Sequence, residues 1–490
     1  MTWSILVCFM ARSSRSTYPH ARILAIDTSK AESLPGVAAV LTAADLGDRV
    51  PTYNGRPVIA ANKVRYVGEP VAAVAATDLA MAEEAASLID VQYVELPPVI
   101  GIDAARANGA PLIHEGHSGN LCSHERVERG NVQEGFAQSD VVVEDDFTFP
   151  MVYHYAMEPH SVIAHWNDEG VTVWSSAQHP FQVRNDIAKV FGILPSRVRM
   201  VISYLGGGYG SKSYTKIEPL VAALARKADA PVRLCNSVSD SMLTVRRHAA
   251  KVRIKTGFKQ DGTIMAREAE IYLDTGAYDD NGPQVTIRAA TRVLGPYRIP
   301  NILTNAYSVY TNSGSAGSFR AIGAPQVIFA GESQIDVGAA RLGMDPAEIR
   351  LKNLLRKGEE LRPGLKGIDA NLASALKKLI NASQWRRPTK KELNPVGLAC
   401  AVTNAGATPV SIAMARLQSD GVVNILAGST EMGQGVRTVL AQIAGEELTV
   451  PLDQISIPGA DTKVTPTIAP PVPAVRRLAW ATRYRPQPVI

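Results

Sequence analysis

The stretch LGGGYGSK, residues 205–212, places four glycines and one tyrosine between an apolar run and an expected helix. The run VRMVISY before it, residues 198–204, predicts a strand, and IEPLVAALARKA, residues 217–228, has amphipathic helical spacing. Glycine lets a backbone adopt positive φ and approach a ligand closely, and helix N-termini favour anions. The stretch therefore indicates a ligand-binding loop or, alternatively, a tight strand-to-helix turn.

Two known phosphate-binding patterns do not fit this stretch. The Walker A pattern needs a lysine directly after its last glycine, but Ser211 separates Gly210 from Lys212. The dinucleotide pattern G-x-G-x-x-G fails because residue 211 is not glycine, and Asp229 matches the usual acidic position only loosely. Neither a P-loop nor a Rossmann turn is therefore indicated.

Two further loops share the small-residue character of this stretch. GSTEMGQG, residues 428–435, again stands between a strand and a helix, and GSAGSFRAIGAPQ, residues 314–326, sets Arg320 among small neighbours before a helix. Three such loops could converge on one extended anionic ligand, with Arg320 and Gln434 as hydrogen-bond donors. Each loop taken alone is also compatible with a structural turn, so both alternatives stay open on the residues alone.

Composition argues against several other classes of protein. The formal net charge is +5 and no block of Lys or Arg occurs, which argues against nucleic-acid binding. The apolar opening WSILVCFM, residues 3–10, is too short to span a membrane and lacks a basic segment before it. We therefore expect no nucleic-acid partner and no membrane partner.

The cysteines and histidines give no metal-binding motif. Widely spaced cysteines without a CxxC pair argue against a zinc or iron–sulfur site and suit a reducing cytoplasm. The four cysteines are Cys8, Cys122, Cys235 and Cys400. Histidines cluster around HYAMEPHSVIAHW without the H-E-x-x-H spacing, so structural roles are favoured for them. These are His154, His160, His165 and His179. Glu158 lies in the same stretch, and the spacing of the sequence indicates no partner for its carboxylate.

The pattern of strands and helices predicts an α+β fold. Short β-rich runs alternate with brief helices up to about residue 125, and longer strands mixed with helices follow from about 140. A further unit starts near 395, and no strict βαβ rhythm runs through the chain. Residues 1–17 show no clear hydrophobic periodicity, and they do not fit the pattern of the segments that follow them.

Seven segments together resemble a known family. The resemblance is to the molybdopterin-binding large subunit of the xanthine dehydrogenase / aldehyde oxidase family of molybdenum hydroxylases, over roughly residues 18–466. The segments, in order, are RYVGEPVAAVAA, MEPH, GGGYGSK, DTGAY, GSFRAIGAPQ, LGMDPAEIRLKNL and GSTEMGQG. Each is weak alone, but their order and spacing make the combination specific.

The resemblance implies an N-terminal α/β hammerhead domain followed by two mixed α+β molybdopterin-binding domains. The implied division is an atypical segment 1–17, hammerhead domain 18–125, linker 126–139, first molybdopterin-binding domain 140–385, truncated second domain 395–466 and aberrant Pro/Arg-rich tail 467–490. In the family the catalytic glutamate lies beyond the point where this chain ends, so the catalytic residue is unknown. We expect an incomplete chain that is inactive by itself because the region with this glutamate is absent. The alternative function is that of a catalytically dead remnant that at most binds partner subunits.

The resemblance also assigns residues to the cofactor, molybdenum held by a molybdopterin dithiolene in a dinucleotide form. No protein side chain is expected to ligate the metal. The implied cofactor-binding residues are Gln178, Gly207, Gly208, Tyr209, Gly210, Arg320, Met432 and Gln434. The implied substrate pocket comprises Tyr209, Ser213 and Ile322.

The implied reaction is hydroxylation of an N-heterocycle or aldehyde carbon, with water as the oxygen source. Electrons are expected to leave through a two-iron two-sulfur subunit and an FAD-binding subunit in the cytoplasm. Gly317 stands where copper-containing carbon monoxide dehydrogenases have cysteine, which argues against that substrate. Ser213 and Ile322 replace the glutamate and the aromatic residue of purine hydroxylases, which argues against xanthine.

Overall fold

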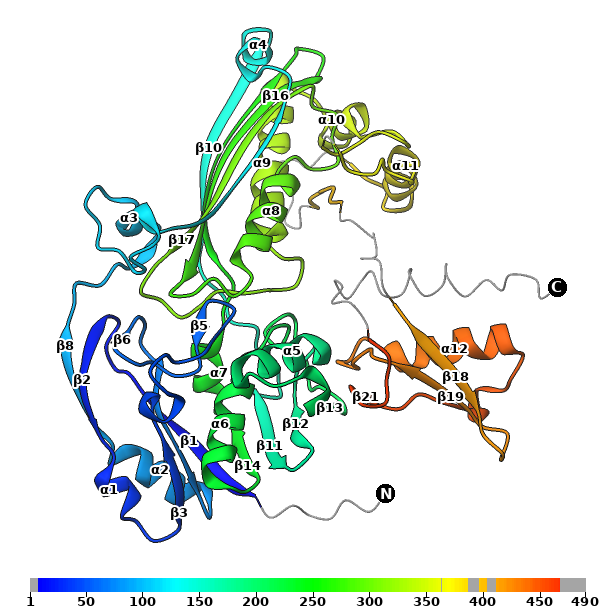
Figure 1. Cartoon of the computed structure of the whole chain (residues 1–490). Helices are drawn as coiled ribbons and strands as arrows, with labels where there is room; N and C mark the ends of the chain where they lie inside the picture. Colours follow the sequence, from blue (N-terminus) through cyan, green and yellow to red (C-terminus); the bar gives the residue numbers. More distant parts are fainter. Residues whose placement is uncertain (1–7, 363, 387–395, 403–410, 468–490) are drawn as a thin grey trace.

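The computed structural model describes residues 8–362, 364–386, 396–402 and 411–467, and it confirms a mixed α+β fold. One lobe is built on a long five-stranded sheet and the other on an eight-stranded sheet (Figure 1). A smaller unit of strands and one helix, formed by residues after 411, lies beside the second lobe (Figure 1). No helix in these described ranges combines the length and apolarity needed to cross a bilayer.

The eight-stranded sheet carries one of the two main cores. Its order is β21-β13-β12-β11-β14-β1-β7-β3. In chain order its strands are β1 (Phe9–Arg15), β3 (Val37–Leu41), β7 (Pro70–Ala76), β11 (Ser161–Asn167), β12 (Gly170–Ser175), β13 (Val198–Ile202), β14 (Val232–Cys235) and β21 (Ala460–Asp461). Helices α5 (Pro180–Phe191) and α6 (Glu218–Ala228) pack against it.

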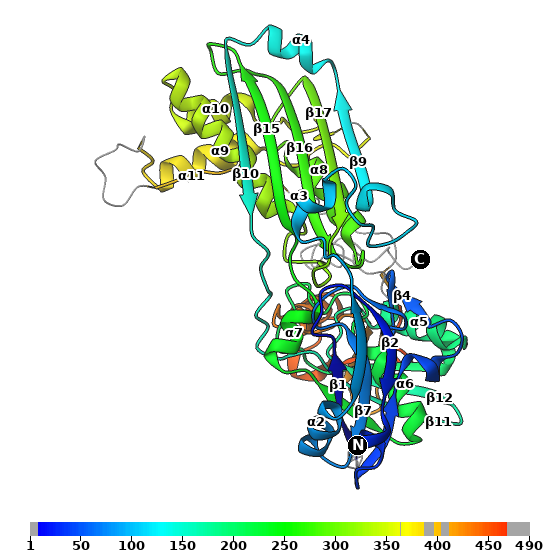
Figure 2. The same ribbon diagram turned by 90° about the vertical axis from the view of Figure 1, so that its left-hand side faces the viewer.

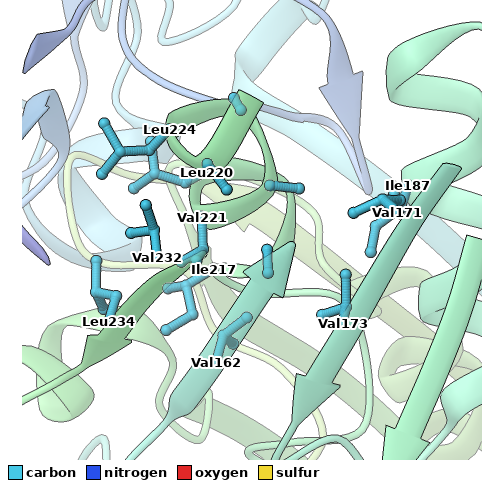
Figure 3. Close-up of a cluster of buried hydrophobic side chains, with 14 of the residues drawn as sticks. Val162, Val171, Val173, Ile187, Ile217, Leu220, Val221, Leu224, Val232 and Leu234 are labelled. Carbon is cyan, nitrogen blue, oxygen red and sulfur yellow. The ribbon is translucent and has the colours of Figure 1, made fainter. Parts of the chain in front are cut away.

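Helix α6 forms where the amphipathic pattern predicts it. Pro219 occupies its first turn, where no amide partner is lost, and Asp229 ends it in the left-handed conformation. Leu220, Val221 and Leu224 lie against β11 and β14 (Figure 3). Each such buried side chain contributes about 1.5–3 kcal/mol, so this packing fixes the helix that follows the glycine loop.

Strand β1 differs from the expectation for residues 1–17. Phe9–Arg15 pair in parallel with β14 and antiparallel with β7, inside the sheet. The sequence FMARSSR has no apolar alternation, and only Ala11 within it is fully buried. Tertiary pairing rather than local propensity forms this strand, as strands in mixed sheets allow.

The five-stranded sheet has the order β10-β15-β16-β17-β9. Its strands are β9 (Leu121–Arg129), β10 (Val141–Phe149), β15 (Ala249–Phe258), β16 (Ile264–Gly276) and β17 (Asn301–Tyr310). Helices α8 (Gly282–Arg292) and α9 (Ala324–Leu342) cover one face, and α3 (Gly101–Arg106) lies on the other (Figures 1 and 2). The sheet therefore holds the start of α8 close to the second lobe.

Residues 126–139, expected to be a linker, are mostly regular structure. The end of β9 pairs with β17 up to Arg129, and α4 (Val132–Ala137) follows with Asn131 as its N-cap. The polar character of this stretch reflects an edge strand and an exposed helix rather than a free connection.

Smaller elements complete the chain. In the N-terminal region these are α1 (Ser29–Glu32), α2 (Leu79–Ser87), β2 (Ala21–Asp27), β4 (Thr52–Tyr53), β5 (Arg56–Pro57), β6 (Lys63–Val64) and β8 (Asp90–Glu95). Elsewhere they are α7 (Val238–Thr244), α10 (Pro346–Asn353), α11 (Leu372–Ala382), β18 (Ala413–Leu417), β19 (Val423–Ala427), α12 (Val436–Leu448) and β20 (Ile455–Ser456). Almost all of the expected tail, 467–490, lies outside the described residues.

Candidate functional site

Gln178 joins two of the three loops that the sequence singles out. It lies between β12 and α5 and is 1% exposed. Its Oε1 accepts a hydrogen bond from the Gly210 amide at 3.1 Å, and its Nε2 lies 3.1 Å from the Met432 sulfur. Its backbone amide donates to the Lys212 carbonyl, and its carbonyl accepts from Thr430 Oγ1. One side chain thereby fixes the glycine loop against the 428–435 loop.

The glycine loop needs glycine for two separate reasons. Gly207 and Gly210 have φ of +92° and +108°, which side chains rarely adopt. A Cβ on Gly208 would lie 2.5 Å from Gln178 Oε1, and one on Gly210 would lie 2.4 Å from the Ser318 carbonyl oxygen. The loop is therefore pressed between Gln178 and the 314–326 loop.

Arg320 lies on the exposed side of that third loop. Its guanidinium makes no hydrogen bond or ion pair with any residue in the described ranges. Ala321 and Ile322 next to it have φ of +75° and +43°, so the backbone here is strained. An exposed, unpaired guanidinium held on a strained turn is suited to binding an anionic group.

The 428–435 loop is ordered by its own carboxylate. Glu431 accepts hydrogen bonds from the backbone amides of Gly433, Gly435 and Arg437 at 2.9, 3.0 and 3.2 Å. The Gln434 side chain accepts from the Met432 amide and donates to the Thr430 carbonyl. Because Leu205 also donates to the Glu431 carbonyl, this loop and the glycine loop form one unit.

The structure thus brings together most of the residues predicted for the cofactor. Gln178, Gly208, Gly210 and Met432 are in direct contact, and Tyr209 is half-exposed at the surface of the glycine loop. Gly207 belongs to the same loop, Gln434 follows two residues after Met432, and Arg320 follows two residues after Ser318, whose carbonyl oxygen faces Gly210. Ser213 is buried behind the loop and Ile322 packs against the core of the five-stranded sheet. Their roles toward a cofactor or substrate stay predictions.

Sequence reasoning left Glu158 without a partner, and the structure supplies two. Its Oε2 accepts hydrogen bonds from Lys212 Nζ at 2.7 Å and from the Gly206 amide at 2.9 Å. Burial lowers the pKa of Lys212, and the Glu158 carboxylate opposes that shift. One carboxylate therefore holds both ends of the glycine loop, a contact that spacing alone does not reveal because 54 positions separate Glu158 from Lys212.

The Glu158→Gln variant is expected to lower the free energy of unfolding by about 1–2 kcal/mol, so that the protein unfolds at a lower urea concentration. The reason is that the Lys212 side chain is 1% exposed and would lose its charged partner. The matched control is Glu169→Gln, which breaks a lysine–glutamate pair of the same 2.7 Å length at an exposed position. That control should change stability by less than about 1 kcal/mol. Equal effects of the two variants in urea unfolding would contradict the role of Glu158.

The residues present fit a large anionic cofactor. A Cβ on Gly433 or Gly435 would meet no atom within 4 Å, so open space lies before the N-terminus of α12. The Ser429 hydroxyl is buried without a hydrogen-bond partner in the described part of the chain. The Gln178 amide and the Arg320 guanidinium supply donors that phosphate and pterin groups need, whereas the amides of Gly433, Gly435 and Arg437 already donate to Glu431.

Comparison with known families places these loops in named domains. The aldehyde oxidase and xanthine dehydrogenase a/b hammerhead domain matches residues 7–97. Two molybdopterin cofactor-binding domains match residues 113–354 and 374–473. The nicotinate dehydrogenase large molybdopterin subunit of Eubacterium barkeri is 34% identical over 359 residues, which covers 71% of this chain and 83% of that protein.

The chain belongs to the xanthine dehydrogenase / aldehyde oxidase family of molybdopterin-binding subunits. The xanthine dehydrogenase molybdenum-binding subunit of Escherichia coli is 34% identical over 490 residues, covering 94% of this chain and 65% of that protein. The solved aldehyde oxidoreductase of Desulfovibrio gigas superposes with a TM-score of 0.85 at 28% identity, over 95% of this chain and 54% of that one. The chain thus spans less than two thirds of the length of these two relatives.

The residues of the candidate site lie in both of the molybdopterin cofactor-binding domains that match this chain. Gln178, the glycine loop and Arg320 lie in the range of the first domain, whereas Met432 and Gln434 lie in that of the second. The hydrogen bonds of Gln178 and Leu205 connect the two. Sequence reasoning missed Ser318, Thr430 and Glu431, although all three stand inside the motifs that it quoted.

Proposed function

We propose that this chain provides the molybdopterin-binding part of an oxidoreductase that hydroxylates an N-heterocycle or aldehyde carbon with water as the oxygen source. The observation that carries the proposal is the position of Gln178, fixed between the glycine loop and Met432. When bound, the molybdenum–pterin group supplies the metal centre for substrate oxidation. The family membership and the donor groups around the loops support this assignment.

The chain's own residues have distinct tasks in this proposal. Gln178 presents its amide at a fixed orientation, because both ends of that amide are already in contact with protein atoms. Arg320 offers its guanidinium to an anionic group. Met432 and Gln434 lie on the side of the site proposed to face the pterin. Tyr209 and Ser213 shape the substrate side, and we assign no catalytic base to this chain.

The proposal extends to the substrate, the partner subunits and the cellular location. Relatives named for quinoline and nicotinate support a nitrogen heterocycle, and the aldehyde oxidoreductase supports an aldehyde. Gly317, Ser213 and Ile322 speak against carbon monoxide and xanthine. A cofactor in dinucleotide form, a two-iron two-sulfur subunit and an FAD-binding subunit complete the proposed complex. The four cysteines, all within the described residues, form no disulfide, which supports a reducing cytoplasm.

Molybdenum content tests the proposal directly. The full chain, purified from cells that make the cofactor, is expected to contain molybdenum and releasable pterin in near-equal amounts. The Gln178→Ala variant should retain less than about a tenth of the metal, because the two loops lose their shared contact. Gln182→Ala, which removes an amide from helix α5 four residues later, is the matched control and should retain the metal.

Two outcomes would overturn the proposal. A folded chain without molybdenum would favour the alternative, an inactive protein that only binds partner subunits. A chain that contains molybdenum but transfers no electrons from quinoline, nicotinate or benzaldehyde to an artificial acceptor, when its partner subunits and a C-terminal segment with the expected catalytic glutamate are supplied, would contradict the proposed reaction.

A further inference from the structure

A second cavity lies outside the site formed by the three loops. Its volume is about 230 Å3, and its walls come from the β4–β5 hairpin, the 113–122 segment, the start of α8 and the end of β17. The lining residues are Gly55, His114, His117, Cys122, Tyr278, Asp279, Pro283 and Tyr310. Nothing in the family motifs of the sequence includes the histidines or Cys122.

Four rings form most of the wall of this cavity. The His114 ring lies 4.7 Å from Tyr310 and 5.6 Å from Tyr278, and the His117 ring lies 5.0 Å from Tyr310. Tyr278 is held in place because its hydroxyl donates to Glu69 and accepts from Arg65. At these distances the rings contact one another, so they form one continuous aromatic wall on which a planar aromatic guest can lie. A smaller cavity of about 150 Å3 already holds benzene in another protein, so one or two fused rings fit here.

The polar groups of the cavity include acceptors suited to a ring N–H. His114 Nε2 donates to the Ala277 carbonyl at 2.6 Å, and burial lowers the pKa of His114 to about 4, so its Nδ1 is an acceptor near neutral pH. The Asp279 carboxylate is a further acceptor in the lining, and burial together with the neighbouring Asp280 raises its pKa. Burial raises the pKa of Cys122, which keeps its thiol protonated. The described residues contain no group of three His, Cys, Asp or Glu placed to bind a metal ion, so an organic guest is favoured.

Asp279 and Asp280 are neighbours that face different sites. A Cβ on Gly55 would lie 1.7 Å from Asp279 Oδ1, which places that carboxylate against the hairpin at the cavity. Asp280 instead pairs with the buried Lys216 at 2.6 Å, and its other oxygen would lie 2.7 Å from a Cβ on Gly317 in the arginine loop. The next residue, Asn281, donates to the Ser318 hydroxyl. One turn therefore separates the cavity from the three loops.

We infer that this cavity is an outer binding site for small planar nitrogen heterocycles, which donate a ring N–H to Asp279 and lie against the wall formed by His114, His117, Tyr278 and Tyr310. The further idea that substrate binds in this cavity before it moves to the three loops rests on the proposed function. The binding itself does not, because it follows from the ring walls and the acceptor groups.

Two matched ligands test the inference with the full chain. Benzimidazole has a ring N–H, and in 1-methylbenzimidazole a methyl group takes the place of that hydrogen on the same ring system. Calorimetric titration at pH 7.5 should give saturable binding of benzimidazole and at least about tenfold weaker binding of the methyl compound, since a hydrogen bond to a charged acceptor is lost. Saturable binding that is equal for both compounds would overturn the role of Asp279.

Variants locate the site. Asp279→Asn should weaken benzimidazole binding about tenfold and reduce the difference between the two ligands, because the charged acceptor is removed. Cys122→Phe should abolish binding by filling the cavity, and Asp146→Asn, at an exposed position of β10, should leave it unchanged. If Cys122→Phe does not fold, Asp279→Asn with the ligand pair still decides. Binding that neither variant alters would mean that the ligand lies elsewhere, and absence of any binding would also overturn the inference.

Molybdenum content of the same samples separates this inference from the proposed function. A chain that holds molybdenum but does not bind benzimidazole overturns only the outer site. A chain that binds benzimidazole with the expected dependence on Asp279 but holds no molybdenum overturns only the proposed function.

Discussion

Replacing Gly210 with alanine is expected to remove molybdenum from the purified chain, to below about a tenth of the unaltered protein. The new Cβ would lie 2.4 Å from the Ser318 carbonyl oxygen and 2.8 Å from its carbon, and the backbone there cannot turn aside as a flexible side chain would. The φ of +108° adds strain for any residue other than glycine. The glycine loop must therefore move away from the arginine loop, which separates the groups proposed to hold the cofactor.

The control for this variant is another glycine with positive φ. Gly192 has φ of +63° at the end of α5, and a Cβ there would meet no atom within 4 Å. Gly192→Ala should cost about 1 kcal/mol of stability through backbone strain and leave the molybdenum content unchanged. Metal analysis and thermal unfolding of both variants separate strain from the clash. Full molybdenum content in folded Gly210→Ala would show that the loop contact does not shape the cofactor site.

Stability is expected to fall steeply as the pH drops below about 6.5. Burial lowers the pKa of His154 to about 4 and those of His160 and His248 to about 3. In the unfolded chain these groups titrate near 6.5. The unfolded state therefore binds more protons below that pH, so the stability is fully present above pH 6.5 and is lost as the pH falls toward the folded pKa values. Each histidine contributes roughly 1 kcal/mol per pH unit, which sums to several kcal/mol by pH 5.

Urea unfolding at pH 7.5, 6.5, 5.5 and 4.5 measures this loss. His160→Gln should lower stability at pH 7.5, because His160 Nε2 donates to the Ser211 carbonyl at 3.2 Å, yet make the pH dependence shallower by about one proton. His124→Gln, at the exposed edge strand β9, is the control that should change neither quantity by much. An unchanged slope in His160→Gln would refute burial of the neutral ring as the cause.

The order of the motifs made much of the site predictable. Strand, glycine turn and helix recur around residues 205–212 and 428–435, and both expected helices form as α6 and α12. Local pattern could indicate these loops because each depends on glycine and on the helix that follows it. The pattern could also indicate the mixed α+β class. The resemblance to a known family implied a hammerhead domain followed by molybdopterin-binding domains, which the family matches confirm.

Other parts of the site depend on contacts between distant residues. Lys212, the charged partner of Glu158, is 54 positions away from it, and Ser318 lies against Gly210 although the two belong to separate segments of the chain. Spacing along a chain carries no information about such pairs, since they form only when separate elements are packed. The cavity with His114 and Asp279 was unpredictable for the same reason, because its walls come from four separate segments.

The sequence by itself determined which residues form the three loops and which family the chain resembles, because those features are local. Only the tertiary structure decided that Phe9–Arg15 form a strand inside the eight-stranded sheet, and that part of residues 126–139 completes the edge of the other sheet. Both segments lack a clear pattern of their own, and they become strands because neighbouring strands offer unpaired amides and carbonyls that must be satisfied. Local propensity is weak in such places, and the packing of the whole chain outweighs it.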